Sequence, residues 1–266
     1  ISSRLIAKLD IDDKAKQYLR AFLIINLIGI MCYMIGRYYV NIPNWLYFIF
    51  SIPIGILFLL FCTTLVYDIS RVLLSLTPIS KSRRRFLKKS LDISSLALAS
   101  TLSLRSLYEA KFVKLERVTI KLKGLKKSYK IAQLSDLHIG GLIDSEFIKD
   151  IVKRVNAINP DLIVITGDLV DTDIDYIKDT LEEFKALNSK YGTYFVVGKH
   201  EYYHGITKII EKVKSLGMRV LENENIYIGE QNEGFNLAGV YDVMGYRTLS
   251  YVPDIDKALK NKKYSP

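Results

Sequence analysis

An uncharged apolar run over residues 45–67 constrains this chain more than any other feature of its sequence. The run is long enough to cross a bilayer as a helix, since the hydrocarbon core needs about 20 residues. A second uncharged stretch covers residues 21–35. Amphipathic side chains suited to the headgroup level crowd the connection between the two runs: Arg37, Tyr38, Tyr39, Trp45 and Tyr47. We therefore predict a transmembrane helical hairpin, the alternative being a buried hairpin of a soluble protein.

Basic residues concentrate around the predicted hairpin. The chain has 38 Lys and Arg against 28 Asp and Glu, and residues 1–107 carry +9 of its net charge of +10. A basic block beside apolar segments is typical of the cytoplasmic flank of a membrane span. A nucleic-acid-binding domain would instead carry its charge on a folded polar surface. We expect a phospholipid bilayer as a partner and no nucleic-acid binding.

Residues 82–88 read Ser-Arg-Arg-Arg-Phe-Leu-Lys and precede a mildly apolar stretch at 91–104. This pattern resembles a twin-arginine export signal, in which Arg83 and Arg84 are the pair read by the export receptor. The resemblance implies a multi-pass protein of the bacterial inner membrane whose C-terminal domain lies outside the cytoplasm. The alternative is a juxtamembrane basic cluster that holds anionic lipid.

From residue 112 onward, short apolar runs alternate with amphipathic stretches. Strand-like spacing begins at 113–122, and buried strands are predicted at 129–134, 161–166 and 193–197. Helical periodicity follows these strands at 145–158, with Ser145 as cap and Asn159-Pro160 as stop, at 174–187 and at 204–216. Alternating strands and helices predict an α/β domain with crossover helices between neighbouring strands.

Each buried strand is followed by a polar cluster. Asp136 and His138 follow the first strand, Gly167-Asp168 the second, and Gly198-Lys199-His200-Glu201 the third. The carboxyl ends of strands face the ligand crevice in open α/β sheets, so these clusters are expected to converge. Carboxylate and imidazole ligands suit divalent cations such as Mn, Fe or Zn. The sequence therefore predicts a metal centre.

The order of these clusters resembles the calcineurin-like metallophosphoesterases, whose pattern is Asp-x-His, Gly-Asp, Gly-Asn-His-Asp/Glu, a further His and Gly-His-x-His. The resemblance covers about residues 129–242. It implies an α/β sandwich with two divalent metal ions, in which Asp136 and His138 bind the first ion and Asp168 bridges both. His200 would be the general acid in hydrolysis of a phosphate ester. The membrane anchor favours a lipid-linked phosphate or pyrophosphate ester as substrate.

Two departures from this pattern concern the second metal ion. Lys199 stands where the family has an Asn, and an ammonium group offers no ligand oxygen and repels a divalent ion. No histidine follows His204, so the later His and the Gly-His-x-His element are missing. We expect a C-terminally truncated domain in which the second metal site is in doubt. The alternative is a catalytically impaired pseudoenzyme that serves as a membrane-proximal binding domain.

Two further motifs overlap this region. His200-Glu201-Tyr202-Tyr203-His204 matches the His-Glu-x-x-His of zinc metallopeptidases, but Gly198 and Gly205 frame it as a turn rather than a helix interior. We interpret His204 as an exposed residue at a helix start, and Asp171, Asp173 and Asp175 as a solvated loop and helix cap. The predicted domains are a membrane hairpin at 1–80, a twin-arginine-like segment at 81–108 and a phosphoesterase domain at 109–266.

Overall fold

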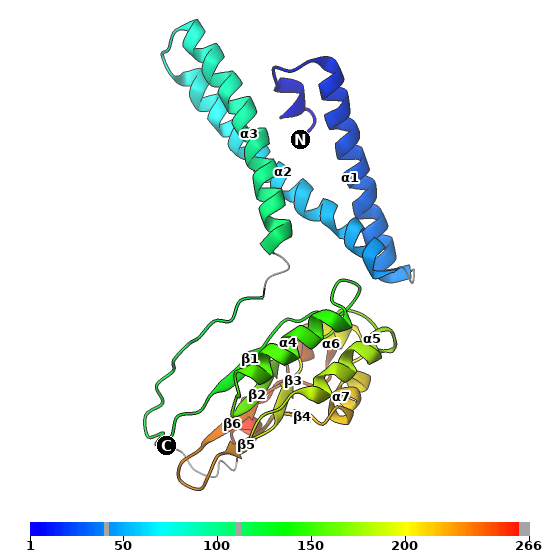
Figure 1. The fold of residues 1–266 in the computed structure, drawn as a ribbon, viewed down its shortest axis with the longest axis vertical. Helices are drawn as coiled ribbons and strands as arrows, with labels where there is room; N and C mark the ends of the chain where they lie inside the picture. Colours follow the sequence, from blue (N-terminus) through cyan, green and yellow to red (C-terminus); the bar gives the residue numbers. More distant parts are fainter. Residues whose placement is uncertain (40–42, 110–112, 261–266) are drawn as a thin grey trace. The chain divides into compact units, whose positions relative to one another are not determined.

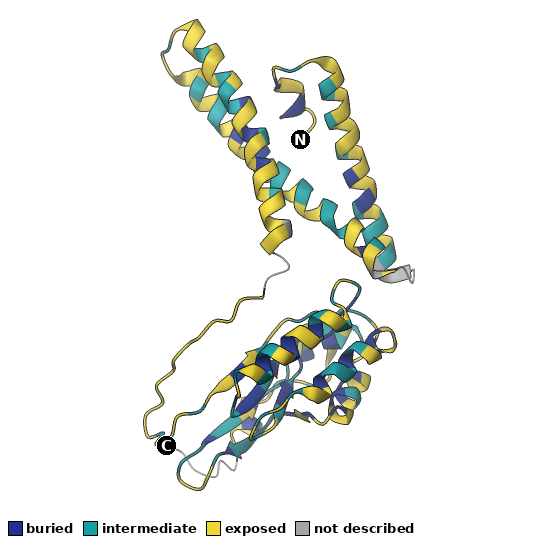
Figure 2. Cartoon of the chain, in the orientation of Figure 1, coloured by how far each residue is buried: buried dark blue, intermediate teal, exposed yellow. Residues whose placement is uncertain are grey.

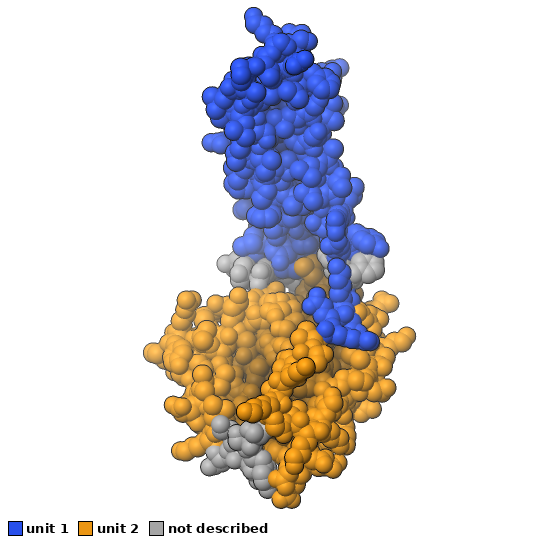
Figure 3. Space-filling view, turned by 90° about the vertical axis from the view of Figure 1, so that its left-hand side faces the viewer, with its two compact units in different colours: residues 1–117 blue, residues 118–266 orange. Residues whose placement is uncertain are grey.

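A computed structural model describes residues 1–39, 43–109 and 113–260 of the protein. Two compact units make up the chain, unit 1 over Ile1–Arg117 and unit 2 over Val118–Pro266 (Figures 1 and 3). The finer division at residues 80 and 108 stays a prediction.

Unit 1 consists of three long helices preceded by a short 3-10 helix. These elements are η1 (Ile6–Lys8), α1 (Asp13–Tyr39), α2 (Asn44–Leu76) and α3 (Lys81–Glu109). Two helical segments, Asp13–Gly36 and Trp45–Leu76, are long and apolar enough to cross a membrane. Many of their apolar residues are exposed, and these stretches of the ribbon are yellow in Figure 2. The sequence therefore correctly predicted two apolar helices before the α/β domain.

The predicted aromatic connection is described only in part. Trp45 is exposed, whereas Tyr47 is buried and its ring lies 4.7 Å from that of Tyr33 on α1. The side chains of Arg37, Tyr38 and Tyr39 lie outside the described part of the chain.

Unit 2 is built on a four-stranded parallel sheet in the order β1-β2-β3-β4. Its strands are β1 (Ile131–Leu134), β2 (Leu162–Thr166), β3 (Thr193–Val196) and β4 (Arg219–Val220). The remaining strands, β5 (Glu224–Ile228) and β6 (Phe235–Gly239), form an antiparallel pair. The helices are α4 (Ser145–Ala157), α5 (Ile174–Glu182), η2 (Glu183–Ala186), α6 (Lys199–Tyr203), α7 (Ile206–Ser215), α8 (Met244–Thr248) and α9 (Ile255–Ala258).

Alternate residues of the central strands serve two separate packing layers. Ile165 and Phe195 pack with buried residues of α4, α5 and α7, whereas Leu162 and Tyr194 pack with residues of β5 and β6. Successive strand side chains point to opposite faces, so the sheet is covered by helices on one face and by the β5–β6 pair on the other (Figure 1). This layering leaves the carboxyl ends of β1, β2 and β3 to form one edge.

Two local predictions were wrong. Residues 113–122 belong to no strand, and Val118 and Ile120 are 78% and 77% exposed, because alternation alone does not supply a neighbouring strand for the backbone. The cap of α4 is Asp144, whose carboxylate accepts a hydrogen bond from Phe147 N at 2.9 Å. Ser145 instead donates to Glu183 Oε1 at 2.7 Å.

Candidate metal centre

The loops that follow β1 and β2 run side by side beyond the sheet. Asp136 N donates to Gly167 O at 3.3 Å, and His138 N donates to Asp168 O at 3.0 Å. Asp136, His138 and Asp168 all have positive φ, at 54°, 46° and 48°. Asp and His are enriched among residues that adopt this left-handed conformation. The backbone bends away from the sheet at these residues and presents their side chains together.

Gly198 brings the loop after β3 against Asp168. A Cβ atom at Gly198 would collide with both the backbone nitrogen and the Oδ1 atom of Asp168. His200 N, two residues later, donates to the same Oδ1 at 2.9 Å. The absence of a side chain at Gly198 therefore lets the third loop hold one oxygen of the Asp168 carboxylate in place.

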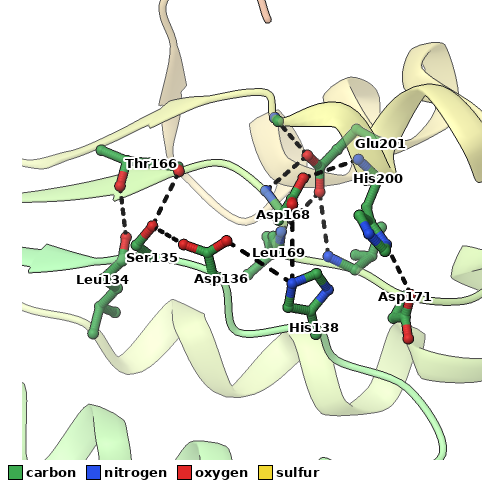
Figure 4. A network of polar contacts seen from close by, with 12 residues as sticks. Leu134, Ser135, Asp136, His138, Thr166, Asp168, Leu169, Asp171, His200 and Glu201 are labelled. Carbon is green, nitrogen blue, oxygen red and sulfur yellow. Dashed lines mark hydrogen bonds and ion pairs between the residues drawn. The ribbon is translucent and has the colours of Figure 1, made fainter. Parts of the chain in front are cut away.

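Glu201 joins the loop after β2 to the loop after β3. Its fully buried carboxylate accepts hydrogen bonds from four backbone N–H groups, those of Gly198, Asp168, Leu169 and Val170, at 2.6 to 3.2 Å (Figure 4). Burial raises the pKa of Glu201, and the four donors oppose that shift by stabilising the ionised form. Glu201 thus fixes the spacing of the two loops.

The sequence-predicted site residues meet at this edge. His138 Nε2 lies 3.9 Å from Asp136 Oδ1 and 3.9 Å from Asp168 Oδ2. Each of His138, Asp168 and His200 offers one ligand atom, and these atoms all lie within 4.8 Å of one another (Figure 4). Asp136 lies on the solvent side, with a side chain 65% exposed, compared with 14% for Asp168. This donor set fits a divalent cation.

Asp171 joins the centre although the sequence interpretation placed it in a solvated loop. Its Oδ1 atom lies 2.8 Å from His200 Nδ1, and its side chain is only 22% exposed. The capping role predicted for this loop belongs to Asp173, which accepts from Asp175 N at 2.9 Å. The available signal for Asp171 was its position three residues after Asp168, in the same strand-end loop.

His204 is half-buried, not exposed, and follows α6. Its Nε2 atom lies 3.9 Å from Asp171 Oδ1, and its ligand atom lies within 4.8 Å of those of Asp171 and His200. Lys199, by contrast, is exposed at the first turn of α6.

The metallopeptidase alternative fails on the position of Glu201. Residues 199–203 do form a short helix, so the expectation of a turn alone was wrong. The carboxylate is nevertheless fully buried and bonded to four backbone N–H groups, whereas a metallopeptidase glutamate must reach the water that it activates.

A parallel sheet whose carboxyl edge gathers aspartate and histidine side chains is the framework of a metal-binding α/β enzyme. Residues 129–264 match the family model described as calcineurin-like phosphoesterase, and the chain belongs to that family. Its members are phosphoester hydrolases that use divalent metal ions.

Curated relatives agree with this assignment. The chain is 40% identical over 185 residues to an uncharacterized metallophosphoesterase of Helicobacter pylori, a match that covers 69% of the chain and 49% of the relative. A Campylobacter jejuni metallophosphoesterase is 32% identical over 199 residues, covering 74% and 52%. A transmembrane protein with metallophosphoesterase domain from Bos taurus is 31% identical over 193 residues, covering 68% and 43%.

The chain spans about half the length of these relatives. No solved structure matches it.

Proposed function

We propose that the intact protein hydrolyses phosphate esters at the centre formed by Asp136, His138, Asp168 and His200. The observation that supports this proposal most directly is the convergence of His138, Asp168 and His200, whose ligand atoms lie within 4.8 Å of one another. They come from three successive strand ends, where the family places its catalytic machinery.

Asp136, His138 and Asp168 would hold the metal ions, Asp168 through the carboxylate oxygen that faces His138. Divalent ions bound there offset the charge of a phosphate ester and make water a better nucleophile. The backbone hydrogen bond from His200 to Asp168 Oδ1 and the left-handed backbone at Asp136, His138 and Asp168 hold these side chains near one another. Such preorganisation removes part of the entropy loss of assembling the site.

His200 is the proton donor of this proposal. The hydrogen bond between Nδ1 and Asp171 orients the ring and, with the carboxylate ionised, places a proton on Nδ1. Nε2 is then the atom that carries the transferable proton of the imidazolium to the leaving oxygen. Asp171 is a positioning residue that also stabilises the positive charge of the ring.

Unit 1 favours a substrate at the membrane. Two helices are long and apolar enough to span a bilayer, and relatives from Bos taurus and Danio rerio are described as transmembrane proteins with a metallophosphoesterase domain. A lipid-linked phosphate or pyrophosphate ester fits this arrangement. The basic flanks and the twin-arginine-like residues Arg83 and Arg84 support an inner-membrane protein with an extracytoplasmic domain. A reporter fused after Asp242 that is active only in the cytoplasm would contradict this topology.

The test of hydrolysis uses the full-length gene product, stripped of metal and reloaded with Mn²⁺. Turnover of a generic phosphodiester and a generic monoester is measured, alongside Mn²⁺ binding by calorimetry. We expect His200→Asn to lower kcat by about 10²- to 10⁴-fold while Mn²⁺ binding is retained. Asp168→Asn should lower both kcat and the affinity for Mn²⁺. Tyr176→Phe, at an exposed site of α5 outside the centre, is the control, and its kcat should stay within about twofold of the unmodified protein.

Lys199 favours a second candidate function, the pseudoenzyme that binds a partner near the membrane. Full-length protein without turnover would leave this alternative standing and overturn the hydrolase. Lys199→Asn separates the two further, because an amide oxygen is a metal ligand and an ammonium group is not. If only the Lys199→Asn protein turns over substrate, the natural protein is the pseudoenzyme.

A further inference from the structure

The N-terminal segment and the end of α2 meet at one end of unit 1. Lys8 Nζ donates to Asp68 Oδ1 at 2.7 Å, and Arg4 Nη1 donates to Asp68 Oδ2 at 3.3 Å. Leu5 and Leu9 are buried in one cluster with Tyr67. The short helix η1 is therefore packed against α2 by both apolar contacts and ion pairs.

A buried polar network ties this junction to α3. Tyr67, fully buried, donates to Asp92 Oδ1 at 2.7 Å, and the other Asp92 oxygen accepts from Asp10 N at 3.0 Å. Arg71 Nη1 donates both to Tyr67 Oη at 2.6 Å and to Lys8 O at 3.1 Å. The network holds the Arg71 guanidinium in one position, so the junction is a built site rather than a set of mobile surface cations.

These elements border an open cavity of about 570 Å³. Four cationic side chains line it, those of Arg4, Lys8, Arg71 and Lys88, against the single carboxylate of Asp68. One carboxylate cannot neutralise four cations, so the cavity attracts an anion. Its volume lies within the range of small-ligand sites.

The position of the cavity along α2 identifies the anion. A helix over the uncharged residues 45–67 measures about 35 Å, slightly more than the hydrocarbon thickness of about 30 Å. Asp68 and Arg71 therefore lie just past the apolar run, at headgroup depth. Basic cavities between helices at this depth recognise anionic headgroups. We propose that this cavity binds the phosphate of an anionic lipid headgroup, independently of the activity of unit 2.

The experiment measures binding of short-chain lipids to the full chain in neutral detergent micelles, by calorimetry. Dioctanoyl phosphatidylglycerol is the probe, with dioctanoyl phosphatidylcholine and inorganic phosphate as comparisons. We expect phosphatidylglycerol to bind at least about tenfold more tightly than either, since it combines the phosphate, the net charge and an anchoring tail. Lys88→Gln should weaken its binding about fivefold.

Lys89→Gln is the matched control, because Lys89 is the next residue on α3, is exposed and does not line the cavity. Lys89→Gln should weaken phosphatidylglycerol binding by less than about twofold. Equal losses in the two variants, at unchanged helical content by circular dichroism, would mean diffuse attraction and overturn the site. Equal binding of the two lipids would overturn it as well. Inorganic phosphate that binds as tightly as phosphatidylglycerol would overturn the lipid as the source of the anion.

Discussion

The two units of this protein differ in the side chains that their helices expose. In unit 1, long apolar side chains face outward, among them Ile25 at 66% and Phe58 at 64% exposure. It also buries five polar residues, Asn26, Thr63, Thr64, Asp92 and Ser95. In unit 2, helices such as α4 bury one apolar stripe and expose the rest. The difference is what a lipid-facing surface on α1 and α2 would require, and it accords with the membrane setting proposed for unit 1.

Each unit nevertheless contains one buried carboxylate that ties separate segments together. Glu201 joins two loops of unit 2 through backbone N–H groups, whereas Asp92 joins α2 and the N-terminal segment of unit 1 through Tyr67 and Asp10. Burying a carboxylate is costly unless hydrogen bonds satisfy it. In both units these hydrogen bonds hold separate segments of the chain in a fixed position relative to one another.

The largest expected effect comes from removing these carboxylates. Glu201→Ala should destabilise unit 2 by about 4 kcal/mol, because it leaves four buried donors without an acceptor. Asp92→Ala should cost about 2 kcal/mol in unit 1, since fewer donors lose their acceptor. Hydrogen exchange resolved by mass spectrometry reports each unit separately. Glu201→Gln keeps one acceptor oxygen, so it should lose less stability than Glu201→Ala. Equal losses of stability would show that the charge of Glu201, rather than its hydrogen bonds, stabilises unit 2.

Outward-facing aromatic residues test the surroundings of each unit. Phe58→Asp should impair membrane insertion by about 3 kcal/mol, because an ionised group near the middle of a span faces hydrocarbon. Tyr176→Asp in unit 2, at a site 68% exposed, should change stability by less than about 0.5 kcal/mol. Insertion is measured with a glycosylation reporter and stability by urea unfolding. Unimpaired insertion of the Phe58→Asp protein would contradict the lipid-facing assignment.

Glycines at close contacts give the next largest effect. Gly198→Ala should cost about 2 kcal/mol, because its Cβ meets backbone and carboxylate atoms that cannot move independently. It should also weaken Mn²⁺ binding, since Asp168 is displaced. The Cβ of Gly29→Ala meets Pro53 Cγ at 2.7 Å, but the helix propensity gained, about 1 kcal/mol, offsets part of that overlap. The stability of unit 2 is measured by thermal unfolding. A Gly198→Ala protein whose unfolding temperature and Mn²⁺ affinity are both unchanged would contradict this account.

The smallest expected effect is acid destabilisation. Burial raises the pKa of Glu222, but hydrogen bonds from Lys214 and Tyr241 outweigh it and leave the pKa below its usual 4.5. A depressed folded-state pKa stabilises the protein above the unfolded pKa, and this contribution is lost as pH falls through the folded value. Glu222→Gln should therefore flatten the stability profile below about pH 4.5.

The matched site in unit 1 is Glu109, whose pKa is also lowered, chiefly by its hydrogen bond from Arg105. This pair is fully exposed, so Glu109→Gln should leave the acid profile unchanged. Urea unfolding at a series of pH values distinguishes the two. An unchanged profile in the Glu222→Gln protein would show that its hydrogen bonds do not persist in solution.

The sequence alone determined the two apolar helices, the three buried strands with the helices between them, and the edge of the sheet at which the site forms. Helices and strands leave local patterns in a sequence, because apolar residues recur with a different period in each. The uncharged run at 45–67 and the apolar runs that alternate with helical periodicity are patterns of this kind. The convergence of Asp136, His138 and Asp168 also followed from sequence, because the carboxyl ends of parallel strands share one edge whatever the loops do.

Only the tertiary structure decided which side chains pair within that edge and at the end of unit 1. Asp171 had the composition of a solvated loop, and Glu201 had the spacing of a peptidase motif; the approach of the β3 loop at Gly198 placed the first beside His200 and buried the second. Likewise, Asp10 and Asp92 are far from Tyr67 and Arg71 in sequence, and the four residues meet only when α2, α3 and the N-terminal segment pack together. Side-chain pairing depends on distances between backbones that no local period encodes, and so it emerges only when the loops and helices are in place.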